Sequence, residues 1–206
     1  SSAASDVYKR QPAGGASPVT RAALVSEVLS SRYADGGWTL LGDTLDVDIT
    51  AMALTALAPY TEDAAVQTAV DAALQMLSDS QLPTGGFVSW DTENCESAAQ
   101  VLVALTSLGI DPLTDSRFLK DGATVLDALC AFAVEGGGFR HIASGDRDGM
   151  ATEQGYYALA AYYRFLNGQT RLYDMSDVTI KANDQPVQPT DPTTPGTPAT
   201  GDNQPV

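Results

Sequence analysis

The chain has 206 residues, enough for one domain with a sizeable core, and its 26 acidic against 11 basic residues give a net charge of −15. This charge excludes nucleic acid and anionic lipid as partners, because binding to either needs clustered lysine and arginine. No run of residues approaches the ~18 apolar residues of a membrane span, so no transmembrane segment is expected.

The first 20 residues are expected to lie outside the fold. Residues 1–11, SSAASDVYKRQ, match the in-frame translation of a sequencing adapter joined to the gene, and residues 12–20 are interpreted as a linker. The natural gene is therefore expected to continue upstream of Pro12.

Residues 21–182 contain three units that repeat with a period near 50 residues. Each unit has an amphipathic stretch, a Gly-Gly-aromatic turn, a short acidic loop and a very apolar stretch. The turns are Gly36-Gly37-Trp38, Gly85-Gly86-Phe87 and Gly137-Gly138-Phe139. One unit cannot bury its own apolar face, so the units are expected to stack on one another.

The spacing of apolar residues predicts an all-α fold of about three helical hairpins. Residues 66–77 and 125–133 place apolar side chains at helical spacing on one side, which is typical of outer helices with one wet face. Residues 48–60, 95–109 and 151–165 are apolar on nearly all sides, which predicts inner helices enclosed by protein. Cys95 and Cys130 fall in helical stretches and are expected to be small buried thiols.

Residues 183–206 are dense in proline and threonine, and we expect a disordered, extended stalk there. Residues 198–202, PATGD, resemble a Gram-positive sortase signal of the LPxTG type, with Thr197 in place of leucine. The resemblance implies cleavage between Thr200 and Gly201, attachment to peptidoglycan and an extracellular location. The alternative is a linker that contains PATG by chance.

The repeats resemble the α/α toroid superfamily of terpenoid cyclases and protein prenyltransferases. Residues 81–87, QLPTGGF, are similar to the QxxxGxW motif of the cyclases, with phenylalanine for tryptophan. The apolar stretches resemble prenyltransferase/squalene oxidase repeats of Gram-positive surface proteins. The resemblance implies a partial toroid, whose remaining hairpins the upstream segment would supply. The chain alone would then expose an apolar edge.

Acidic residues precede or open each apolar helix, and in a toroid these positions meet at one mouth. They could form a rim that holds a ligand or cation, or they could be N-caps that accept hydrogen bonds from free amides. The candidate ligand-binding residues are Asp48, Glu96, Glu153, Gln154 and Tyr156.

The catalytic motifs of the superfamily are incomplete in this chain. Residues 46–49, DVDI, are one carboxylate short of the DxDD motif of the cyclases. Residues 93–95 resemble the D-x-C zinc element of the prenyltransferases, but residues 151–154 lack the expected histidine, and the sole histidine is His141. We therefore predict no catalytic residue, no metal site and no cofactor.

Two functions remain open. The first is a non-catalytic cell-surface binding or scaffold module for an unknown small molecule or surface ligand, with cobalamin as one candidate because cobalamin carriers use a related toroid. The second is an isoprenoid-processing enzyme, similar to a prenyltransferase or a squalene or terpene cyclase, with its catalytic residues upstream.

Overall fold

The computed structural model describes residues 19–42 and 45–179. The expectations for residues 1–18, for the stalk and for Thr200 and Gly201 concern residues outside these ranges. Six α-helices form the described part: α2 (Arg21–Ser30), α3 (Val47–Leu57), α4 (Ala64–Ser80), α5 (Cys95–Ser107), α6 (Val125–Ala131) and α7 (Gly149–Leu166). None of them is long and apolar enough to cross a membrane.

Short elements join the helices. The 3-10 helices are η1 (Ala58–Tyr60) and η2 (Ser116–Phe118). Two antiparallel hairpins of two-residue strands precede α5 and α7: β1 (Val88–Ser89) with β2 (Thr92–Glu93), and β3 (Phe139–Arg140) with β4 (Arg147–Asp148). The predicted all-α class is confirmed.

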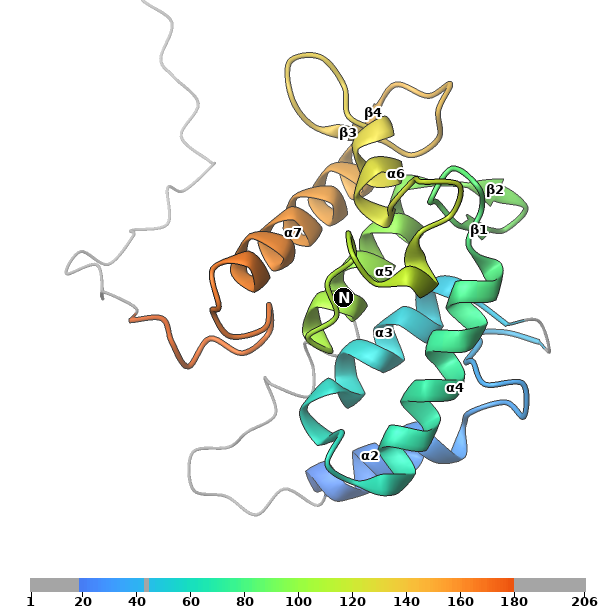
Figure 1. The fold of residues 1–206 in the computed structure, drawn as a ribbon, viewed down its shortest axis with the longest axis vertical. Helices are drawn as coiled ribbons and strands as arrows, with labels where there is room; N and C mark the ends of the chain where they lie inside the picture. The colour runs from blue at the N-terminus through green and yellow to red at the C-terminus, as the bar shows by residue number, and fades with distance from the viewer. Residues whose placement is uncertain (1–18, 43–44, 180–206) are drawn as a thin grey trace, which may run out of the picture.

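The helices form two layers. The inner helices α3, α5 and α7 pack side by side with α5 in the middle, while α4 packs on α3 and α6 packs on α5 (Figure 1). Leu54 of α3 and Leu102 of α5 are fully buried in one core, against which Leu159 of α7 packs. The predicted inner and outer helices are therefore present.

The three Gly-Gly-aromatic turns share one pattern of backbone hydrogen bonds. In each turn the first glycine has a positive φ, and its amide donates to the carbonyl of the residue three positions earlier. The amide of that earlier residue donates in return to the carbonyl of the second glycine. The bonds measure 2.9–3.1 Å and join the glycine pairs to Tyr33, Leu82 and Val134. The repeat in the sequence is therefore a repeat of local structure.

The aromatic residues that follow the glycines are core residues. Trp38, Phe87 and Phe139 are all buried. In the first and third units a threonine of the inner helix, Thr50 or Thr152, accepts a hydrogen bond from the aromatic residue's amide at 2.9 Å and donates to its carbonyl at 3.2 Å. These residues join each turn to its inner helix.

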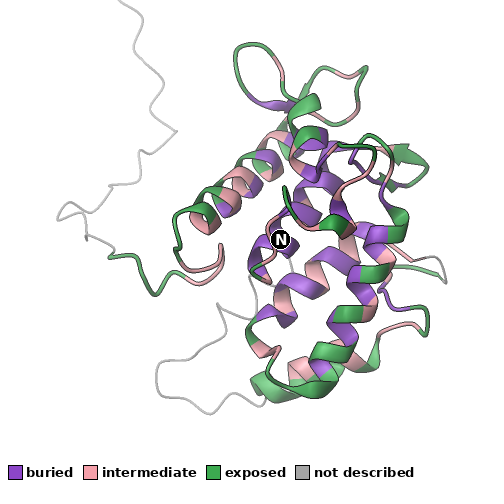
Figure 2. Ribbon diagram, viewed as in Figure 1, coloured by how far each residue is buried: buried purple, intermediate pink, exposed green. Residues whose placement is uncertain are grey.

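The inner helices differ in how far they are buried (Figure 2). In α5, 12 of 13 residues are buried, whereas α7 buries only Ala151, Gly155, Ala158 and Ala161 along its 18 residues. The expectation that every inner helix is enclosed by protein is wrong for α7. Within the described residues α5 covers one side of α7 and no helix covers the other, so tyrosine and leucine side chains form an exposed edge: Tyr156, Tyr163 and Leu166.

Candidate functional site

The residues directly before the inner helices are N-caps. The side chains of Asp46, Asn94 and Asp148 cap α3, α5 and α7, and each accepts a hydrogen bond of 2.8–3.1 Å from backbone amides of the first turn. Such caps satisfy amides that the helix itself leaves free. The capping interpretation therefore holds for α3 and α7, whereas the cap of α5 is the amide of Asn94 and not an acidic residue.

Asp48 and Glu96 each lie two residues beyond the cap, in the first turns of α3 and α5, and their charges interact across the inner layer. Burial raises the pKa of Asp48, and the charges of Asp46 and Glu96 raise it further, while the nearby hydroxyl of Ser97 opposes the shift. Glu96 is buried and pairs with Nδ1 of the half-exposed His141 at 2.7 Å. Two acidic side chains, Asp48 and Glu96, therefore lie close together and largely shielded from solvent at the N-terminal end of the inner helices.

Glu153 and Gln154 of α7 lie near these charged side chains. Gln100 of α5 donates to Oε1 of Gln154 at 2.9 Å and also donates to the hydroxyl of Tyr157. Burial raises the pKa of Tyr157, and nearby groups that include Glu153 and Asp48 raise it further. We call this row of side chains across the three inner helices the polar face.

Tyr156 lies apart from the polar face. Its hydroxyl accepts a hydrogen bond from the Gly138 amide at 3.0 Å, and its ring packs edge-on against Phe139 with 5.7 Å between the centroids. The structure therefore brings together Asp48, Glu96, Glu153 and Gln154 but assigns Tyr156 to the turn of its own unit.

The two cysteines have different environments. Cys95 is fully buried, its thiol contacts the Ala151 carbonyl at 3.8 Å, and burial raises the pKa of the thiol to about 12. A thiol with this pKa stays protonated at neutral pH and is a poor nucleophile and metal ligand. Cys130 is exposed on the short outer helix α6, so the expectation that both thiols are buried is wrong for Cys130. Between residues 19 and 42 and between 45 and 179, no three potential ligands cluster as a metal site needs.

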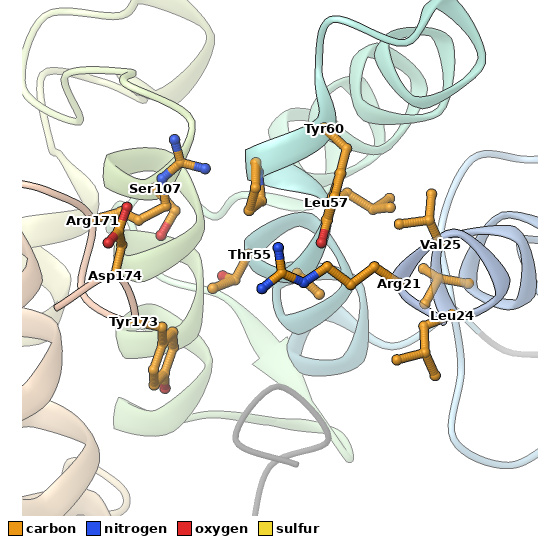
Figure 3. Close-up of a pocket in the computed structure, with 13 residues that line it drawn as sticks. Arg21, Leu24, Val25, Thr55, Leu57, Tyr60, Ser107, Arg171, Tyr173 and Asp174 are labelled. Atoms are coloured by element: carbon orange, nitrogen blue, oxygen red, sulfur yellow. The ribbon is translucent and has the colours of Figure 1, made fainter. Parts of the chain in front are cut away.

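A groove lies at the opposite end of the inner helices. It has a volume of about 390 Å³ and runs between α2, the end of α3 with η1, and residues 171–174 (Figure 3). Small-molecule sites in proteins usually measure roughly 300–1,000 Å³. Six of its 13 lining residues are aliphatic, among them Leu24 and Val25 from α2 and Leu57 from α3.

Two arginines enter this groove from opposite sides. Arg21 extends from α2, and Arg171 comes from the segment that follows α7 (Figure 3). Nη1 of Arg171 is buried without a hydrogen-bond partner, and neither arginine takes part in an ion pair within the part of the chain that the structure describes. Asp174 also lines the groove.

One residue, Tyr173, connects the groove to the polar face. Tyr173 lines the groove, and it also lies close enough to Tyr157 to contribute to the raised pKa of that phenol. No motif in the sequence indicates the groove residues. The only related feature is that lysine and arginine are scarce: the whole chain has 11, and two of them line this one groove.

A scan of the chain against protein-family models finds no match, and a search of curated proteins finds no significant match. The function is therefore argued from this chain's own residues and geometry.

Proposed function

We propose that the chain is a non-catalytic binding or scaffold module of the cell surface, built from units of an α/α toroid. The observation that carries the proposal is the groove of about 390 Å³ between α2, α3 and residues 171–174, because a mostly apolar wall with a few polar groups is the usual form of a small-molecule site. The Pro/Thr-rich residues 183–206 support display outside the cell, with attachment at Thr200 and Gly201.

The polar groups near the inner helices support binding rather than catalysis. The capping side chains are held by backbone amides, and the thiol of Cys95, next to Glu96 in the chain, is buried and has a raised pKa. Gln81, which carries much of the resemblance to the cyclases, donates to the carbonyls of Gly85 and Phe118 at 2.9 and 3.1 Å. That glutamine therefore ties one unit to the next.

The proposal is tested with Nile red, a neutral apolar dye, at protein concentrations low enough to prevent self-association. Val25→Trp fills the groove from α2, whereas Ala22→Trp adds the same ring to an exposed position of α2 outside the groove. We expect Val25→Trp to weaken dye binding about tenfold, since it removes apolar surface available to the dye. The control should bind as the parent does.

Equal dye binding by the two variants would remove the groove as the binding site. The isoprenoid-processing alternative places its catalytic residues upstream, so its own measurement uses the chain extended by the upstream sequence and incubated with farnesyl diphosphate. Release of pyrophosphate above the rate of a heat-denatured sample would contradict a non-catalytic module.

A further inference from the structure

We propose that the groove binds small amphiphiles with a single carboxylate head group, held between Arg21 and Arg171, with the apolar chain along α2 and the end of α3. This inference rests on the proposed function, because it names the ligand class of the same groove.

The charges in the groove differ from those of the whole protein. The chain carries a net charge of −15, yet the groove contains two guanidinium groups and one carboxylate, that of Asp174. A cationic site in a strongly acidic protein attracts an anion locally while the remaining surface repels it. The groove therefore selects anions that are small enough to enter it.

The side chain of Arg171 indicates the head group that the groove would bind. The Arg171 guanidinium donates no hydrogen bond to any described residue, and since protein atoms cover its Nη1, a ligand oxygen would accept from its remaining N–H groups. A guanidinium group matches a carboxylate particularly well, because its planar fork can donate two parallel hydrogen bonds. Arg21 on the opposite side adds a second positive charge.

The apolar wall indicates the remainder of the ligand. Leu24, Val25 and Val28 of α2 offer aliphatic surface to a hydrocarbon chain, whose burial contributes in proportion to the area removed from water. A diphosphate head group fits less well, since its several negative charges would face only two arginines with Asp174 beside them. Within the described residues, no cluster of ligands could hold a metal ion to offset that charge.

The test compares head groups on one chain length. The whole protein is titrated with octanoate, 1-octanol, octylamine and geranyl diphosphate, and binding is followed by ligand-observed NMR. We expect octanoate to bind roughly tenfold more tightly than octanol, as charge-assisted hydrogen bonds allow, and octylamine to bind most weakly.

The possible failures are distinguishable. If none of the octyl compounds binds but Nile red binding still falls in Val25→Trp and not in its control, this inference fails and the proposed function stands. If Nile red binding does not distinguish the two variants either, both fail. If octanol binds as tightly as octanoate, the groove is a binding site but its preference for carboxylates is refuted. Tighter binding of geranyl diphosphate than of octanoate overturns the inference in favour of isoprenoid ligands.

Matched variants locate the head group. Arg21→Gln and Arg171→Gln should each lower octanoate affinity roughly tenfold and leave octanol affinity unchanged, whereas Arg147→Gln, on β4 away from the groove, should alter neither. Arg21→Glu should shift the preference from octanoate towards octylamine. Arg21 is exposed, so its substitution is compatible with folding, which far-UV circular dichroism verifies. Unchanged octanoate affinity in both glutamine variants would refute the inference.

Discussion

Replacing Gly85 by alanine tests how the repeated units pack on one another. Gly85 has a φ of +83°, and a Cβ added there would lie 2.2 Å from the carbonyl oxygen of Thr124 and 2.7 Å from its carbonyl carbon. Thr124 is the N-cap of α6, the outer helix of the next unit. In the first unit Gly36 faces the backbone of Ala72 in α4 in the same manner. The first glycine of the pair is thus where one unit contacts the next.

The expected cost of Gly85→Ala has two parts. A left-handed backbone conformation costs an L-residue about 1–2 kcal/mol, and overpacking against a rigid backbone costs about 1–3 kcal/mol, for a total of roughly 2–5 kcal/mol. Gly109 has a φ of +75°, and a Cβ added there would meet no atom within 4 Å, so Gly109→Ala should cost only the first part. Gly137, at φ +92°, meets only the Tyr156 hydroxyl at 3.3 Å and should resemble Gly109.

Urea unfolding followed by circular dichroism gives the free energy of unfolding of each variant from its midpoint and slope. We expect Gly85→Ala to lose at least about 1 kcal/mol more than Gly109→Ala and Gly137→Ala. Equal losses in the three variants would show that the glycine serves its own turn alone and that the packing argument is wrong.

Three further outcomes are expected. Phe87→Ala should lower the free energy of unfolding by about 3–5 kcal/mol because the ring is fully buried. Trp90→Ala, at a residue 77% exposed, should change it by about 0.5 kcal/mol or less, and similar values for the two variants would contradict the assigned core. Asp48→Asn should stabilise the protein at about pH 7 but not at about pH 3. Burial raises the pKa of Asp48 above 3.8, so the penalty for its charge appears as the pH rises through the folded-state pKa. A gain in the free energy of unfolding that is independent of pH would refute this explanation. The exposed edge of α7 should cause self-association at high concentration, which Tyr163→Ser with Leu166→Ser reduces in sedimentation velocity; a parent chain that stays monomeric at all concentrations would contradict this.

Much of the fold follows from local sequence. The glycine pairs predict their turns because a positive φ is readily available only to glycine, and each pair indeed adopts the same turn. The apolar spacing of residues 66–77 predicts α4, whose buried apolar residues are those expected, although Ser78, expected on the exposed face, is buried as well. The acidic residues before α3 and α7 predict caps, since a cap bonds to amides only two or three residues away, but the cap of α5, Asn94, was not predicted.

Which residues form the polar face and the groove is decided by tertiary packing. Four of the five candidate binding residues lie along one face, but Tyr156 does not, because the helical rotation of α7 directs it to its own turn. Whether α7 is enclosed depends on which helices flank it, and its apolar sequence carries no information about neighbours. Arg21 and Arg171 come together from opposite ends of the described chain. Hydrogen bonds between near neighbours can be inferred from the sequence, whereas the convergence of distant side chains is decided only when the helices pack.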